Sequence, residues 1–435
     1  MLETLKNAWR VKEIRNKILF TFMIIAVFRI GSVLPVPFIN IAALKESFAE
    51  GMSNDFMGYL NILTGGALNY GALFAMGVTP YINSSIIMQL LTVAIPALER
   101  MSKEGEEGRK KIAAITRYVT VLLGLLQGSA FYYWLVNSHA QGGSGSGFIS
   151  ISGTGNLTFV AITIILCFTA GTALMMWMGE RIDEKGIGNG ISILLFSGII
   201  SRLPAGAAQM IAFIRHKMYV EVGAVLIAFV AVIAFVIWMS DAERRIPIQY
   251  AKRVVGRKQY GGQSTHMPIK VNMSGVMPII FASSILMLPT MILGFTGKNE
   301  DTTIYKVLSF MSIKSWAYAA VYFGMIIAFA YFYTTIQYNP VEMANNLRKN
   351  SGAIPGIRPG KPTSDFIGKI LAKITLVGAL FLGAIAVLPI VVGQIGGINV
   401  SLGGTSLLIV VGVAVETVKQ LESQMMMRHY KGFLD

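Results

Sequence analysis

The residue types that carry out most enzyme chemistry are few and scattered in this 435-residue chain. Its single cysteine, Cys167, falls inside an apolar stretch, so neither an intrachain disulfide nor a cysteine-based zinc site is expected. The four histidines, His139, His216, His266 and His429, lie far apart in connecting segments. The chain contains no H-E-x-x-H sequence and no G-x-x-x-x-G-K-[S/T] phosphate-binding loop. We therefore predict that it is not an enzyme and has no catalytic residue, metal site or cofactor.

Charged residues are rare within the long apolar stretches. Arg29 lies near the middle of the first stretch, where an arginine costs about 2.5–3.5 kcal/mol on insertion scales. We expect it to face a watery interior or an acidic partner. Glu416 is the one acidic residue well inside a stretch. Ion-coupled transporters usually need embedded acids, so their scarcity argues against that class of protein.

The elements that hold these residues are apolar segments of membrane-spanning length. Hydrophobic residues make up 54% of the chain and charged residues 14%, whereas a soluble domain is about a quarter charged. A helix needs about 20 apolar residues to cross the ~30 Å hydrocarbon layer. The pattern predicts an all-α polytopic membrane protein with ten transmembrane helices, over residues 18–38, 75–98, 111–136, 156–179, 187–203, 219–240, 273–294, 315–338, 368–392 and 403–424.

The distribution of positive charge orients these helices. Most of the 37 Lys and Arg fall before the first span and in alternate connections, and they account for most of the net charge of +15. Lys and Arg are retained in the cytoplasm during insertion, so that side is predicted to be cytoplasmic, with both termini on it. The excess positive charge also suits anionic lipid. Nucleic-acid binding is not expected of a chain that is mostly embedded in the bilayer.

Segments outside the spans differ in character. Residues 1–17 place Leu2, Leu5 and Trp9 on one helical face against basic residues, which predicts an amphipathic helix in the cytoplasmic interface. The Gly/Ser tract 141–147 predicts a flexible tether. Residues 425–435 are expected to form a cytoplasmic tail.

The external segment before the second span is apolar but is broken by glycine. Within residues 55–72 lie four glycines and the polar residues Asn61, Thr64 and Asn69. Lipid does not accept such irregular backbone, so the segment must pack inside protein or line a water-filled cavity. It is either a re-entrant packing segment or a movable stopper, and these residues alone leave both open.

Two cytoplasmic connections are longer than packed helices require, and long connections are often functional. Residues 241–272 carry Arg244, Arg245 and Lys252 before Gly261-Gly262, which predicts a hairpin tip at the two glycines. Residues 338–368 contain the sequence Ile354-Pro-Gly-Ile-Arg-Pro-Gly360, in which two Pro-Gly pairs form a rigid turn around Arg358. A turn that presents a guanidinium outward predicts docking of a cytosolic partner.

Several sequence runs, in order along nearly the whole chain, resemble the bacterial SecY family. These runs are residues 27–32 (VFRIGS), 80–91 (PYINSSIIMQLL), 103–109 (KEGEEGR), 179–181 (GER), 186–192 (GIGNGIS), 275–284 (GVMPIIFASS), 354–360 and 403–409 (GGTSLLI). Each longer run agrees at six or more positions. The chain departs from the family pattern at the Gly/Ser tract, which affects one external loop.

The resemblance implies a protein-conducting channel in the bacterial cytoplasmic membrane. It implies an hourglass of two pseudo-symmetric five-helix halves, residues 18–203 and 219–424, joined by an external hinge loop at 204–218. The channel would translocate unfolded secretory polypeptides and release hydrophobic segments laterally into lipid. SecE-type and SecG-type subunits would accompany it, and a SecA motor or a ribosome would supply the energy while a signal peptide and unfolded preprotein occupy the channel.

The same resemblance implies roles for individual residues. The constriction ring would consist of Ile82, Ile86, Ile187, Ile191, Ile280 and Ile409, with each pair four residues apart sharing a helix face. The plug would include Asp55, Asn61, Leu63, Thr64, Gly65, Gly66 and Asn69. The lateral gate would use Asn83, Ser84, Gln89, Gln127, Ser283 and Ser284. The docking surface would use Arg358, Arg244, Arg245, Lys252, Arg257 and Lys258.

Two other classes of protein are alternatives to this interpretation. A solute transporter with broken helices would need embedded ion-binding acids and a polar pocket at the midplane. An intramembrane enzyme would need clustered His/Asp or Ser/His residues inside the spans, although scattered residues could still meet in space.

Overall fold

A computed structural model gives the fold for most of the chain. It describes residues 9–50, 61, 64–139, 148–149, 156–215, 217, 219–250, 253–255, 258–260, 264–296, 316–396 and 404–431. The predicted tether at 141–147 lies outside these ranges, as do residues 1–8 of the predicted interfacial helix.

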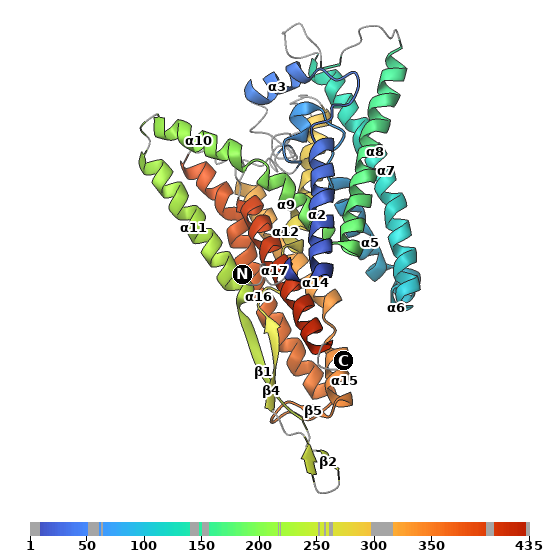
Figure 1. The fold of residues 1–435 in the computed structure, drawn as a ribbon, viewed down its shortest axis with the longest axis vertical. Coiled ribbons are helices and arrows are strands. Elements are labelled where there is room, and N and C mark those ends of the chain that lie inside the picture. Colours follow the sequence, from blue (N-terminus) through green and yellow to red (C-terminus); the bar gives the residue numbers. More distant parts are fainter. Residues whose placement is uncertain are drawn as a thin grey trace.

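Long helices dominate the described residues and form one bundle (Figure 1). The first half of the chain contributes α2 (Lys12–Gly31), α3 (Ile41–Glu50), the 3-10 turn η2 (Ala67–Tyr70), α5 (Thr79–Ala94), α6 (Pro96–Lys103), α7 (Glu106–His139), α8 (Leu157–Lys185), α9 (Gly190–Ile200) and α10 (Leu203–Arg215). The second half contributes α11 (Tyr219–Asp241), α12 (Met277–Thr296), α14 (Trp316–Gln337), α15 (Pro340–Lys349), α16 (Lys361–Gly396) and α17 (Gly404–Lys431).

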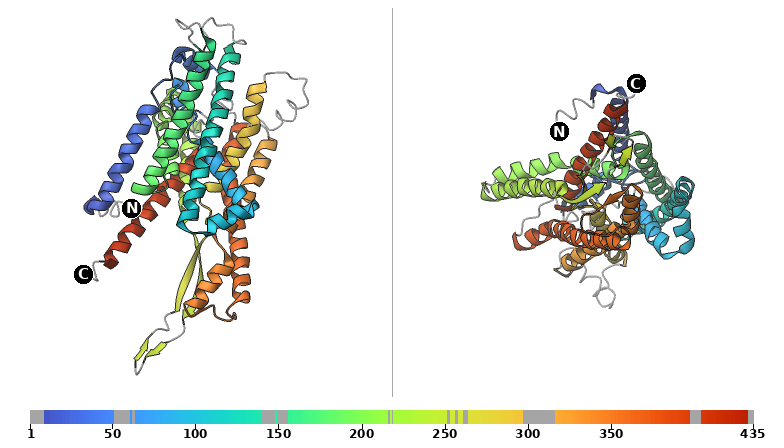
Figure 2. Two further views of the ribbon diagram at one scale, coloured as in Figure 1. Left: turned by 90° about the vertical axis from the view of Figure 1, so that its right-hand side faces the viewer. Right: turned by 90° about the horizontal axis from the view of Figure 1, so that it is seen from below.

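Every predicted span overlaps a helix of the structure. Within the described residues, five helices are long and apolar enough to cross a membrane, and the bent pair α5/α6 would make a sixth. The fold class is therefore confirmed as a helical membrane protein, while the number of ten crossings stays a prediction. Helix α2 begins and α17 ends on the side of the bundle from which a β-ribbon projects (Figures 1 and 2).

The bounds of two helices differ from those of the predicted spans. Ile95 precedes Pro96 and takes an extended conformation (φ −107°, ψ 113°), as the ring of a following proline demands. The chain therefore turns by 101° between α5 and α6, so the predicted span 75–98 ends at this break. The first helix begins at Lys12, so residues 12–17 continue into the first span instead of forming a separate interfacial helix.

The connection 204–218, predicted as a hinge loop, is mostly helical. Helix α10 covers Leu203–Arg215 and follows α9 after a short break. Its sequence is rich in alanine and long apolar side chains, which favour helix over loop. Helices α10 and α11 form a hairpin that projects from one side of the bundle (Figure 2).

The strands lie in the two long connections predicted to be cytoplasmic. A three-stranded antiparallel sheet has the order β4-β1-β5, with β1 at Glu243–Tyr250, β4 at Ser264–Lys270 and β5 at Gly352–Ala353. A second hairpin pairs β2 (Arg253–Val255) with β3 (Lys258–Tyr260). Because Val255 is paired with Lys258, this hairpin reverses between those residues, and the predicted tip at Gly261-Gly262 is wrong.

Candidate functional site

The candidate site is a buried apolar cluster to which most helices of the bundle contribute, and we call it the central cluster. It includes buried residues from α2, α5, α8, α9, α11, α12, α14, α16 and α17, so segments from both halves of the chain meet in it. Among the described residues of the chain, none that is buried carries a charged side chain. Apolar contact is non-directional and excludes water.

Four of the six predicted ring residues lie in the central cluster. Ile82 and Ile86 come from α5, Ile280 from α12 and Ile409 from α17, and all are buried. Ile191 of α9 is partly buried and packs against the same cluster. These five isoleucines, from four helices, therefore belong to or pack against one apolar cluster.

Ile187 lies elsewhere. It is buried with Ile14 and Leu421 in a separate small cluster, packed by Val11 and Met425. Helix α9 begins only at Gly190, after Gly188 at φ +82°, so Ile187 and Ile191 do not share a helix face. The backbone N–H of Ile187 donates to Thr21 Oγ1 at 3.2 Å, which fixes it beside α2.

Leu195, which was not predicted as a ring residue, is also buried in the central cluster. It lies four residues after Ile191 on α9, so the two side chains share a face of this helix. The signal that could have found it is the helix start: Asn189 caps α9 by accepting a hydrogen bond from the N–H of Ser192.

The predicted plug segment is folded back on itself. Asn61 and Asn69 are joined by two hydrogen bonds, from Asn61 Nδ2 to Asn69 Oδ1 at 2.6 Å and from Asn69 N to Asn61 Oδ1 at 3.3 Å. Gly65 and Gly66 both take left-handed conformations, which glycine adopts without strain. Thr64 is buried, whereas Asp55 and Leu63 lie outside the described residues.

Three of the six polar residues predicted for the lateral gate donate hydrogen bonds, each within its own half of the chain. Ser84 donates to the carbonyl of Thr116 at 2.7 Å, which joins α5 to α7. Gln89 donates to Ser85, and Ser283 donates to the carbonyl of Ile280 on its own helix. The remaining candidates, Asn83, Gln127 and Ser284, are buried. Helix α12 lies against both α5 and α7, where the family resemblance puts the gate.

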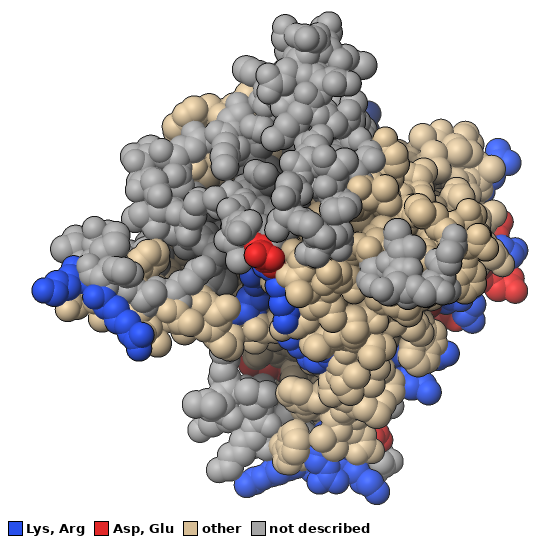
Figure 3. All heavy atoms as spheres, turned by 90° about the horizontal axis from the view of Figure 1, so that it is seen from above, with Lys and Arg blue, Asp and Glu red and all other residues tan. Residues whose placement is uncertain are grey.

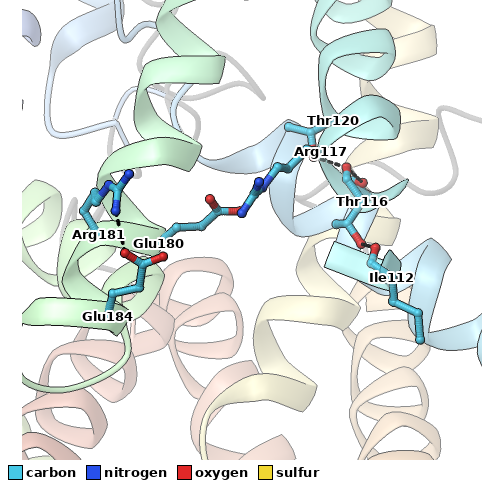
Figure 4. Close-up of polar contacts among 8 residues, drawn as sticks. Ile112, Thr116, Arg117, Thr120, Glu180, Arg181 and Glu184 are labelled. Atoms are coloured by element: carbon cyan, nitrogen blue, oxygen red, sulfur yellow. Dashed lines mark hydrogen bonds and ion pairs between the residues drawn. The ribbon is translucent and has the colours of Figure 1, made fainter. Parts of the chain in front are cut away.

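An ion pair joins α7 to α8 close to these residues. The guanidinium of Arg117 lies 2.8 Å from Glu180 Oε1, and the two side chains point toward each other from neighbouring helices (Figure 4). Both helices belong to the first half, so this pair supports the half itself and does not cross to α12.

The two predicted docking connections form a single folded unit, which we call the cytoplasmic unit after the side of the membrane predicted for it. Strand β1 pairs with β5 at Gln249–Ala353, and β1, α15 and α16 enclose an apolar core that includes Ile246, Ile248, Leu347 and Ile367. The unit projects from the lower end of the bundle in the views of Figures 1 and 2. The opposite face, where it is described, is mostly uncharged with scattered Lys and Arg (Figure 3).

The basic residues of this unit face outward where the structure describes them. Arg358 is exposed on its turn, which is closed by a hydrogen bond from Thr363 Oγ1 to the Arg358 carbonyl. Gly356 and Gly360 supply the two left-handed positions on either side. Arg244 and Arg245 are exposed on β1, and Arg245 pairs with Glu243 at 2.7 Å. Lys258 lies in β3, whereas Lys252 and Arg257 lie outside the described residues.

Two observations concern charged groups and metal ligands inside the bundle. The Nη1 atom of Arg29 is buried and has no hydrogen-bond partner among the described residues, so an acidic partner for it is not found there. In the same part of the chain, no group of three or more His, Cys, Asp or Glu side chains could hold a metal ion.

Comparison with known proteins gives a consistent match. The family model described as SecY matches residues 72–418. The chain is 45% identical over 444 residues to the protein translocase subunit SecY of Bacillus subtilis (strain 168), and 42% identical over 442 residues to that of Streptomyces galbus. In both cases the match covers 100% of each chain.

The fold also matches solved structures at low sequence identity. One, described as "The structure of a protein conducting channel", has a TM-score of 0.66 at 17% identity and covers 94% of this chain and 92% of its own. Another, "Sec61 in the Canine ribosome-channel complex from the endoplasmic reticulum", has a TM-score of 0.61 at 16% identity, with the same coverage.

Proposed function

Because the chain belongs to the SecY family of protein translocase subunits, we propose that it translocates unfolded secretory polypeptides across the bacterial cytoplasmic membrane and releases hydrophobic segments laterally into lipid. The observation that carries this proposal is the central cluster, a buried apolar cluster in which helices of both halves meet.

The constriction in this proposal is formed by Ile82, Ile86, Ile191, Ile280 and Ile409, with Leu195 in the place predicted for Ile187. Apolar contact has no preferred direction, so it can close around any passing side chain without retaining a particular sequence. Hydrophobic constrictions also block water and ions by dewetting. Uncharged, branched side chains therefore suit a channel that must admit many polypeptides and leak little.

Lateral release follows from solvent partitioning at the seam between α12 and the pair α5/α7. A Leu or Ile gains about 0.3–0.6 kcal/mol at a membrane helix centre, whereas a Lys or Asp costs about 2.5–3.5 kcal/mol. An apolar segment of about 20 residues therefore leaves sideways, and a polar segment continues through the channel. The hydrogen bonds of Ser84 and Gln89 lie within the first half, and that of Ser283 lies within the second. Separation of α12 from α5 and α7 would therefore break none of them, which supports lateral opening there.

Energy for transport comes from a cytosolic partner that docks on the cytoplasmic unit. A SecA motor or a ribosome is the partner we propose, with SecE-type and SecG-type subunits in the membrane. Arg358 is the first docking residue, because two left-handed glycines hold its turn and expose its side chain. Arg244 and Arg245 add to the same positive surface.

A charge reversal tests the docking assignment. Arg358→Glu should abolish SecA-driven transport into reconstituted vesicles while the channel stays folded and inserted. Lys349→Glu is the matched control, because Lys349 is also an exposed cation of the cytoplasmic unit but lies on α15 outside the turn. Normal transport by the Arg358 variant, or equal loss in both variants, would remove Arg358 from the docking surface.

Crosslinking tests the channel itself. A cysteine at Ile86 or Ile191, in a chain whose native Cys167 is replaced by alanine, should crosslink to a stalled secretory polypeptide. A cysteine at Leu122, which is largely exposed on the outside of α7, should not. Absence of crosslinks from both ring positions would contradict the proposed function.

A further inference from the structure

Gly65, in the predicted plug segment, contacts the C-terminal end of α9 at Gly198 and Ser201. An ideal Cβ at Gly65 would lie 2.8 Å from the carbonyl oxygen of Gly198 and 2.9 Å from its Cα, so the two backbones touch. Ser201 Oγ lies 2.6 Å from the Gly198 carbonyl and 3.3 Å from the Gly65 carbonyl, so its one proton is shared between them. We propose that Gly198 and Ser201 form the seat that positions the plug in the resting channel.

The described part of the segment, Asn61 and residues 64–72, is held as a unit by hydrogen bonds of its own. Two bonds join Asn61 and Asn69, and a third runs from Gly66 N to the Asn61 carbonyl. Backbone bonds from Val36 N to the Gly71 carbonyl and from Leu73 N to the Leu34 carbonyl tie the C-terminal end of this unit to the chain. None of these bonds involves α9, so they can persist when the contact with the seat is broken.

The contact with the seat is close but weak. It consists of van der Waals contact between two glycines and one shared hydroxyl proton. A shared hydrogen bond between neutral groups is worth little, and the glycine contact carries no directional force. Close fit gives a seal, while the small number of bonds allows a passing polypeptide to displace the unit. This inference rests on the proposed function, in which residues 55–72 close the external side.

The neighbouring glycine supplies a matched control. Gly65 and Gly66 have φ values of +67° and +90°, so alanine is strained at both positions, and more so at Gly66, whose φ lies further from the left-handed region open to alanine. At Gly66, however, an added Cβ would meet nothing within 4 Å, whereas at Gly65 it would meet the backbone of α9. A larger effect of Gly65→Ala than of Gly66→Ala therefore reports the contact with the seat and not backbone strain.

The experiment measures resting ion conductance of the complete, purified channel complex in planar bilayers. Gly65→Ala should raise this conductance clearly above that of Gly66→Ala. Ser201→Ala, which adds no atom and should fold, is expected to raise the open fraction by about two- to tenfold, as loss of one neutral hydrogen bond would. With a stalled polypeptide in the channel all variants should conduct like the unaltered protein, a result that a general loss of stability would not give.

Deleting residues 61–70 separates the inference from the function beneath it. If the deletion leaks ions but Gly65→Ala matches Gly66→Ala and Ser201→Ala matches the unaltered channel, the seat is wrong and the plug remains. If the deletion leaves resting conductance unchanged, the plug assignment itself is wrong and the seat has no role.

Discussion

Two isoleucines that are almost equally buried offer the sharpest test of the site. Ile86 is 3% exposed in the central cluster, and Ile187 is 4% exposed in the separate cluster with Ile14 and Leu421. Replacing either by alanine removes three carbon atoms, which corresponds to about 2.4 kcal/mol of lost burial at about 0.8 kcal/mol per methylene. With the cavity left behind, the cost reaches about 2–5 kcal/mol.

The two variants should therefore lose similar stability but differ in conduction. Both Ile86→Ala and Ile187→Ala should unfold at a lower temperature in detergent, because each opens a cavity of similar size. Only Ile86→Ala should raise resting conductance, because Ile187 packs between α2 and α17, away from the central cluster. Cysteines at the two positions, placed in a Cys167→Ala chain, should divide in the same way when a stalled polypeptide is present.

One result would refute this reasoning. If Ile187→Ala leaks ions as strongly as Ile86→Ala, and a cysteine at 187 crosslinks as well as one at 86, then Ile187 lines the channel. The relocation of that residue to the side of α2 would be wrong, and Leu195 would lose its place in the constriction.

Three further variants test the packing that holds the site. Gly190→Ala should prevent accumulation of the folded channel, because its Cβ would lie 2.0 Å from the Gly179 carbonyl, whereas Gly223→Ala on α11 meets nothing within 4 Å and should be harmless in the same expression assay. Ile367→Ala, at a fully buried position of the cytoplasmic unit, should cost about 2–5 kcal/mol and speed proteolysis of that unit, with resting conductance unchanged. Glu180→Gln should lower stability by only about 0.2–1 kcal/mol, because its partner Arg117 is half exposed, and a large shift in melting temperature would contradict this.

The membrane-spanning elements and the exposed turn were accessible from sequence because local signals determine them. Each segment predicted as a span from the length of its apolar stretch overlaps a helix of the structure. The Pro-Gly pairs around Arg358 predicted an outward turn, and that residue is exposed. Each of these signals lies within about 20 consecutive residues, where hydrophobicity and backbone restriction act without help from distant parts of the chain.

The features that the sequence analysis missed depend on distant contacts or on the start of a helix. Pairing of Gln249 with Ala353 joins two loops into the cytoplasmic unit. A local sequence pattern cannot predict pairing between strands that lie about a hundred residues apart in the chain. The Ile187–Ile191 pair failed because spacing of four residues indicates a shared face only inside a helix. Gly188 is left-handed and α9 starts at Gly190, so the rule did not apply there.

The two halves of the chain meet on two sides, one at α9 and α17 and the other at α5 and α12. The contacts on these two sides differ, and the difference favours opening on one of them. On the side of α9 and α17, the cluster of Ile14, Ile187 and Leu421 crosses between the halves, and Lys17 Nζ donates to Gln424 Oε1 at 3.4 Å. On the side of α5 and α12, the hydrogen bonds given by Ser84 and Ser283 remain within one half. Lipid can replace the apolar contacts of α12 at little cost, since acyl chains are as apolar as the side chains they displace. The Lys17–Gln424 hydrogen bond is a link between the halves for which the described residues show no counterpart between α5 and α12. Opening should therefore occur at α12, with the α9–α17 side as the hinge.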